Sequence, residues 1–136
     1  MKRKIGIALA CLILVTAVFT GCASTKLAEG FDKDAVIEKA KQTVDVINTL
    51  DYAAMTALMR DDLEAQLSSD KLKEAWDKKL TELGAFEKID NVSVVGQKTE
   101  QSDYAVAVVV AKYKNGNAIY TLSFDPDMEL AGMYMK

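Results

Sequence analysis

The chain has 136 residues, 27% of them charged, with a formal net charge of −3 and no histidine. Residues 1–21 hold three of the 17 basic residues and none of the 20 acidic ones, so the remainder carries a formal charge of −6. This acidic balance argues against nucleic acid as a partner, because phosphate binding needs a basic patch. The absence of histidine removes the commonest general base and metal ligand, so no metal and no cofactor is expected.

The N-terminus has the three parts of a secretory signal peptide. Residues 1–4 are basic, an apolar run extends from Ile5 to Thr20, and the small residue Gly21 precedes Cys22. The run is shorter than the ~20 residues of a spanning helix, which disfavours an uncleaved anchor. Ordinary secretion with cleavage after Ala23 is a further alternative, since residues 21–23 fit a small-x-small pattern.

The junction Phe19–Thr20–Gly21–Cys22 resembles the lipobox of bacterial lipoproteins, with Phe19 where that family usually has Leu. The resemblance implies cleavage between Gly21 and Cys22, a diacylglycerol on the Cys22 thiol and acylation, for example with palmitate. The chain is then held by this lipid at the extracytoplasmic side of the cell membrane, in the cell envelope. Cys11 leaves with the signal peptide, so neither a disulfide nor a free thiol is expected in the mature chain.

Residues 22–31 are small and polar and predict a lipidated tether, whereas residues 32–136 predict one domain. Apolar residues spaced by three and four predict helices over residues 32–50 and 51–66, with Asp51 as the N-cap of the second. A third helix follows the polar residues 68–70 and ends at Gly84.

From Phe86 onward the apolar period changes to two, which predicts strands over residues 86–99, 104–113, 118–124 and 128–135. Residues 104–113 are apolar on both faces, so we expect a central strand covered on both sides. Asn115–Gly116 predicts a type I′ hairpin turn, and Asp125–Pro126–Asp127 a second turn. Three helices before a four-stranded meander indicate an α+β fold, with the helices packed on a curved antiparallel sheet.

Short motifs spread over Phe31 to Lys136 carry a family resemblance. They are Asn48–Thr49–Leu50–Asp51–Tyr52, Leu72 with Ala75–Trp76, Leu83–Gly84–Ala85–Phe86, Tyr113–Lys114–Asn115–Gly116, and Phe124–Asp125–Pro126–Asp127 with Gly132. This order resembles the cone-shaped, cystatin-like fold of nuclear transport factor 2 and ketosteroid isomerase. It is more closely similar to a bacterial domain of unknown function found in secreted proteins and lipoproteins, sometimes before a serine hydrolase.

The resemblance implies a cavity between the sheet and the helices. The residues expected to line it are Trp76, Tyr104, Tyr120, Phe124 and Tyr134. A packed core with a few edge aromatics is the alternative, because tyrosines fit half-buried strands.

Acidic residues supply few candidates for catalysis or metal binding. Asp51–Tyr52 and Asp61–Asp62 are the only pieces comparable to the acid–base groups of the isomerases of this fold. Asp51 is better explained as an N-cap and the second pair as solvated, so no catalytic residue is assigned. The acidic residues 125–129 have too few oxygens for calcium and predict an ordinary turn.

The sequence therefore predicts a lipid-anchored lipoprotein whose domain binds a partner rather than catalysing a reaction. A second copy of the chain, an envelope protein or a small apolar ligand is the expected partner. The alternative is a small-molecule enzyme or apolar-ligand carrier that uses the cone pocket. A filled cone with an exposed apolar sheet face favours the first hypothesis, and an apolar cavity holding Asp and Tyr side chains favours the second.

Overall fold

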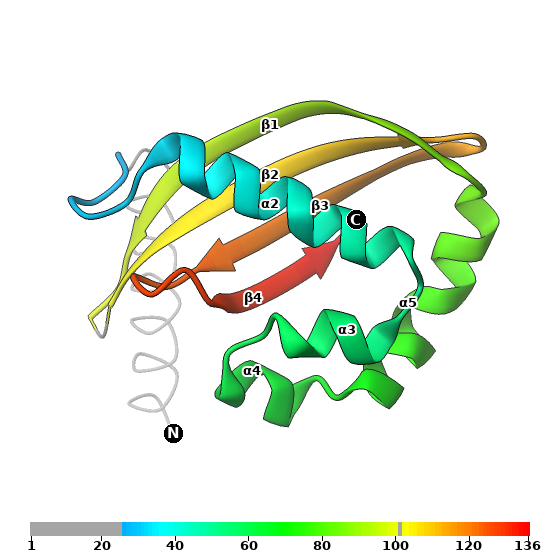
Figure 1. The fold of residues 1–136 in the computed structure, drawn as a ribbon, viewed down its shortest axis with the longest axis horizontal. Coiled ribbons are helices and arrows are strands. Elements are labelled where there is room, and N and C mark those ends of the chain that lie inside the picture. The colour runs from blue at the N-terminus through cyan, green and yellow to red at the C-terminus, as the bar shows by residue number, and fades with distance from the viewer. Residues whose placement is uncertain (1–25, 101) are drawn as a thin grey trace, which may run out of the picture.

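The computed structural model describes residues 26–100 and 102–136. Within these ranges the chain forms four helices followed by four strands, as expected of an α+β fold (Figure 1). The predicted signal peptide and Cys22 lie outside the described residues. The elements are α2 (Lys33–Asn48), α3 (Tyr52–Ala57), α4 (Asp61–Gln66), α5 (Ser69–Leu83), β1 (Phe86–Lys98), β2 (Asp103–Tyr113), β3 (Gly116–Phe124) and β4 (Leu130–Met135).

The strands form one open antiparallel sheet in the order β1-β2-β3-β4, which is the predicted meander. The sheet curves, and α2 lies across its concave side (Figure 1). Register fixes which residues share a face: Val109 pairs with Val92 and Tyr120, and all three point toward the helices. This side of the sheet and the helices above it form the hydrophobic core.

Helix α2 begins at a capped residue and packs through one apolar stripe. The Asp32 carboxylate accepts a hydrogen bond from the Asp34 N–H at 2.9 Å, which satisfies one of the free amides of the first turn. Its buried stripe includes Val36, Val44 and Ile47. The predicted helix ran to Leu50, but α2 ends at Asn48, and Leu50 has a φ of 59° and is 44% exposed.

The second predicted helix, residues 51–66, was wrong as a single element. It is split into α3 and α4, because Met59 forms a parallel bridge with Leu130 of β4. The Arg60 N–H donates to the Leu130 carbonyl at 2.8 Å, and the Leu130 N–H donates to the Leu58 carbonyl at 3.2 Å. These bonds to the sheet edge replace helical ones, so the predicted three helices are four among the described residues.

The hairpin between β2 and β3 caps the end of α5. Gly84 ends this helix with a φ of 78°, as predicted. The N–H groups of Lys114 and Asn115 donate to the carbonyls of Ala85 and Leu83, at 2.8 and 2.9 Å. Lys114 and Asn115 are the turn residues, and neither has a positive φ. The predicted type I′ turn was therefore wrong, since contacts with α5 decide the turn.

Strand β2 is covered on one side only, in contrast to the prediction. Ala105, Ala107 and Val109 face the helices and are fully buried. Val106 and Val108 point to the opposite side and are only half-buried, because no described helix lies there (Figure 1). The sheet thus has a packed inner face and an open outer face.

Residues 26–31, within the predicted tether, contact the domain. Leu27 and Phe31 pack against the core. Lys26 lies so close to Gly96 of β1 that a Cβ atom there would clash with the Lys26 carbonyl oxygen. The described residues contain no helix long and apolar enough to cross a membrane.

Candidate functional site

Three of the five predicted pocket residues lie in the core. Tyr120 and Phe124 are fully buried and Trp76 is 8% exposed. The Trp76 and Tyr120 rings contact each other with centroids 5.9 Å apart. These aromatic side chains fill the space between the helices and the sheet. This arrangement agrees with a packed core, which is the alternative to the predicted pocket.

The other two predicted pocket residues point away from the helices. Tyr134 pairs with Thr121 on the outer face and is 63% exposed. Tyr104 precedes the buried Ala105, so it also faces outward and is half-buried. The structure therefore does not bring the five residues together, because the two-residue period of the strands separates them between opposite faces.

A chain of buried hydroxyl groups runs through the inner face to the end of α2. The Tyr120 and Tyr113 hydroxyl oxygens are 2.6 Å apart, and the Tyr113 hydroxyl donates to Asn48 Oδ1 at 2.5 Å. Burial raises the pKa of Tyr113, and burial together with the hydrogen bond to Tyr113 raises the pKa of Tyr120. Both groups therefore stay neutral, as donors rather than bases.

Asp51 and Tyr52 do not form an acid–base pair. The Asp51 carboxylate accepts from the Ala54 N–H at 3.1 Å, which confirms it as the N-cap of α3. The Tyr52 hydroxyl donates to the Asp77 carboxylate of α5 at 3.0 Å. Burial, and then the contact with Asp77, raise the pKa of Tyr52 to about 12.

The other acidic residues have structural roles. Asp61 and Asp62 are exposed, and two hydrogen bonds from the Arg60 guanidinium lower the pKa of the Asp62 carboxyl. Asp125 is 5% exposed and accepts from the N–H groups of Asp127 and Glu129, at 3.0 and 2.9 Å. It also lies 3.5 Å from the Arg60 guanidinium, so it fixes the turn between β3 and β4. No group of three potential metal ligands occurs in the ranges that the structure describes.

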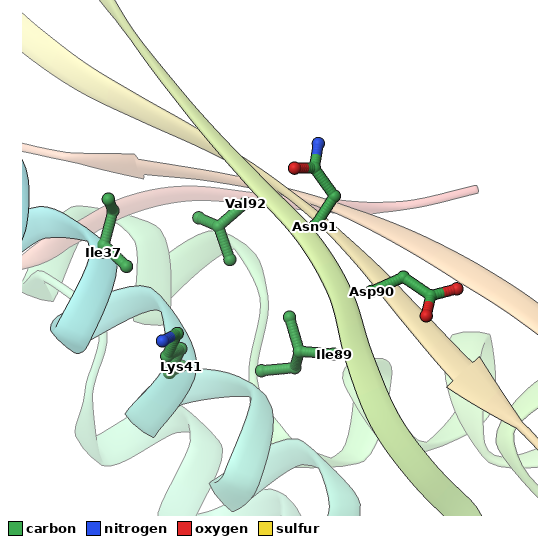
Figure 2. Close-up of a pocket in the computed structure, with 6 residues that line it drawn as sticks. All are labelled: Ile37, Lys41, Ile89, Asp90, Asn91 and Val92. Carbon is green, nitrogen blue, oxygen red and sulfur yellow. The ribbon is translucent and has the colours of Figure 1, made fainter.

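A shallow groove of about 300 Å³ separates α2 from the edge strand β1. Figure 2 shows Ile37 and Lys41 of α2 facing Ile89 and Val92 of β1, with Asp90 pointing away. Asp90 is the extra residue of a bulge in β1 and pairs with Lys88 at 3.4 Å. Asn91 also lines the groove, and because the Asp90 side chain points away from Lys41, the two do not form an acid–base pair there.

The outer face of the sheet holds exposed apolar side chains in the described part of the chain. Its exposed members include Val95, Ile119 and Tyr134, at 43%, 38% and 63% exposure. The cross-strand register places half-buried valines of β2 between them. We call this set the outer patch: Val95, Val106, Val108, Val110, Ile119 and Tyr134.

Fold and surfaces together define an α+β domain with a filled core, an open antiparallel sheet and no recognisable catalytic centre in its described part. The chain belongs to the family described as protein of unknown function DUF3887, whose model matches residues 40–133. This confirms the resemblance to a domain of unknown function.

A solved structure is also similar: the NMR structure of a protein from Ruminococcus gnavus ATCC 29149 has a TM-score of 0.73 and 28% identity. The match covers 82% of this chain and 97% of that chain, so in that protein the domain folds almost alone. No curated protein matches the chain.

The sequence assigns Asn48 no role beyond a family motif, and it places Leu50 in the apolar stripe of the first predicted helix. Asn48 gave no signal, because its buried partner Tyr113 comes from the distant strand β2. Leu50 gave no signal of its left-handed backbone either, since the residue in that conformation after a helix is usually glycine or asparagine.

Proposed function

We propose that this chain is a lipoprotein, lipidated on Cys22 at the extracytoplasmic side of the cell membrane, whose domain is a non-catalytic interaction module. The basic start, the apolar run and the Gly21–Cys22 junction support the anchor. We further propose that the fold belongs to the cone-shaped, cystatin-like group, supported by the long helix α2 across the concave side of a curved sheet (Figure 1).

The outer patch is the observation that carries the interaction role. Large apolar side chains seldom gather on the surface of a monomeric protein without a function. Here Val95, Ile119 and Tyr134 remain exposed while the inner face of the same sheet is filled. A packed core beside an open apolar face therefore supports a binding role for this domain.

We take a second copy of the chain as the partner of the outer patch. The neighbours that the register places among these residues, Ser93, Thr121 and Ser123, are uncharged, so two copies can meet at the centre of the patch without burying like charges. Two antiparallel sheets pack face to face in stable sandwiches, with interdigitating β-branched side chains. Lipid anchors on both copies would hold them in one membrane plane and raise their effective concentration.

The contacts of residues 26–31 support a domain held close to the membrane. Leu27 packs on the core and Lys26 lies against Gly96. Four residue steps separate Cys22 from Lys26, and they span at most about 14 Å. The end of the sheet near the β1–β2 connection would then face the lipid.

The anchor is tested by Cys22→Ala in cells. The lipoprotein proposal expects this variant to leave the membrane fraction or to accumulate as an uncut precursor. Processing and membrane retention like those of the wild type would refute it.

The dimer is tested separately on residues 23–136 by sedimentation velocity. We expect a concentration-dependent dimer that Val108→Asp abolishes, because an unpaired carboxylate would be buried in the interface. Ala35→Asp, on the exposed surface of α2, adds the same charge and is the control. A monomer at all concentrations, or equal effects of the two variants, argues against the outer patch as a dimer interface.

A further inference from the structure

We infer that a cavity at the C-terminal end of α2 binds a small uncharged molecule that presents a hydrogen-bond acceptor, such as a carbonyl oxygen, to the Asn48 side-chain amide. The cavity has a volume of about 230 Å³. It lies on the helix side of the sheet, so this site is independent of the outer patch. Its lining comes from four elements and their ends: Asn48, Leu50, Leu80, Gly84, Ala85, Phe86 and Tyr113.

The hydroxyl chain determines which atom of Asn48 needs a partner. Tyr120 donates to the Tyr113 oxygen, and Tyr113 donates to Asn48 Oδ1. This direction gives both phenolic hydrogens an acceptor. With the amide reversed, Asn48 would donate to Tyr113 and Tyr113 to Tyr120, so the Tyr120 hydrogen would have no acceptor among the described hydrogen bonds. Asn48 Nδ2 is therefore the end of the chain.

Asn48 Nδ2 is buried and has no hydrogen-bond partner in the described structure. A buried donor without an acceptor is destabilising, and such groups are rare in folded proteins. A ligand that supplies the acceptor recovers this free energy on binding. The unpaired donor thus selects for an acceptor-bearing molecule.

The lining and the unpaired donor together favour an uncharged ligand. No charged side chain contributes to it. The C-terminal ends of both α2 and α5 lie at the cavity, and the negative end of a helix dipole disfavours an anion. The same helix ends favour a cation, but the lining has no carboxylate to pair with it, and a simple cation offers no acceptor to Nδ2. The remaining class is an uncharged molecule, smaller than the drug-sized ligands that need about 300 Å³ or more.

Leu50 is the lining side chain that can move to admit the acceptor. Leu80 and Tyr113 are buried, whereas Leu50 is 44% exposed. Its φ of 59° places a leucine in the left-handed region, where the Cβ atom strains the backbone. A movement of Leu50 out of this conformation relieves backbone strain. The backbone therefore does not oppose a movement of Leu50 that exposes Asn48 Nδ2 to the ligand.

The test uses residues 23–136 in solution, since the similar NMR structure shows that such a domain folds almost alone. Acetophenone is the probe. Ethylbenzene, which lacks the acceptor, and benzoate, which adds a negative charge, are the two control ligands. The readout is the side-chain amide signal of Asn48 in ¹H–¹⁵N spectra. We expect acetophenone to shift it saturably and to bind about tenfold or more tightly than the other two, as one recovered hydrogen bond predicts.

The variant Asn48→Asp tests the contribution of the amide donor alone. It keeps an oxygen for Tyr113 but removes the N–H groups, so the preference for acetophenone over ethylbenzene should vanish. Asn117→Asp, on the exposed part of β3, makes the same change elsewhere and should keep it. Three results with the wild type would overturn the inference. They are equal binding of acetophenone and ethylbenzene, tighter binding of benzoate, and an Asn48 signal that does not shift up to the solubility of acetophenone. None of these results depends on whether the variant folds.

Discussion

At the scale of single residues, the tyrosines of the inner face combine apolar packing with fixed hydrogen bonds. Tyr52 donates to Asp77 across α3 and α5, whereas Tyr113 and Tyr120 join β2 and β3 to the end of α2. Each ring adds buried apolar area, and each hydroxyl keeps a partner, which is the condition for burying it. These three side chains therefore define how the helices sit on the sheet.

The raised pKa of Tyr52 predicts a loss of stability in alkali. Tyr52 ionises near pH 10 when unfolded and at about 12 when folded, so the folded state retains the proton longer. This contribution to the free energy of unfolding is complete below pH 10 and is lost as the pH rises toward 12. In the Tyr52→Phe variant, the free energy of unfolding should fall less steeply between pH 10 and 12, by up to about 1.4 kcal/mol per pH unit.

Urea unfolding at several pH values measures this slope. Tyr134→Phe is the control, because its side chain is 63% exposed on the outer face. If Tyr134→Phe flattened the alkaline decline as much as Tyr52→Phe, the assignment to Tyr52 would fail.

At the scale of elements, β1 is an edge strand protected along its length. Two register shifts bend it, and Lys88 pairs with Asp90 at the second one. Near its other end, Gly96 faces the segment that begins at Lys26. Bulges, charges and a covering segment are the usual means by which a free strand edge avoids pairing with another chain.

The contact at Gly96 predicts a strong effect of one methyl group. Gly96→Ala would place a Cβ atom against the Lys26 carbonyl and 3.0 Å from the Leu27 Cα. We expect a loss of about 1–3 kcal/mol in the free energy of unfolding and faster tryptic cleavage after Lys26. Gly132→Ala is the matched control in β4, since its Cβ would lie 3.4 Å from Ser123, in ordinary contact. Similar cleavage rates in the two variants would contradict the packing of this segment.

At the scale of the whole molecule, stability comes from a single core on one side of the sheet. The core includes residues of α2, α3, α5 and all four strands, while the outer face contributes none of the fully buried side chains in the described part. Truncating a side chain in this core should therefore lower the free energy of unfolding far more than truncating the same type of side chain on the outer face.

Two isoleucines test this asymmetry directly. Ile47 is 0% exposed in the core and Ile119 is 38% exposed in the outer patch. Ile47→Ala should lower the free energy of unfolding by about 2–5 kcal/mol, and Ile119→Ala by about 0.5 kcal/mol or less at concentrations where the domain is monomeric. Urea titration of both variants decides the matter, and comparable losses would mean that the outer face is packed after all.

The features that are local in the chain could be predicted from the sequence. Periodicity placed α2, α5 and the four strands, and capping chemistry identified Asp51 and Gly84. Long-range contacts overrode local preference elsewhere. Met59 pairs with Leu130 and splits a helix, and Asn115 bonds to α5 and changes the hairpin turn.

The sequence by itself determined the α+β class, the antiparallel meander and the family resemblance, because each depends on the order and period of apolar residues along the chain. Only the tertiary structure decided which face of the sheet is covered. It moved Tyr104 and Tyr134 out of the predicted pocket and left Asn48 Nδ2 without a partner. Both outcomes depend on pairing between distant segments, and a one-residue change of register reverses every side chain of a strand.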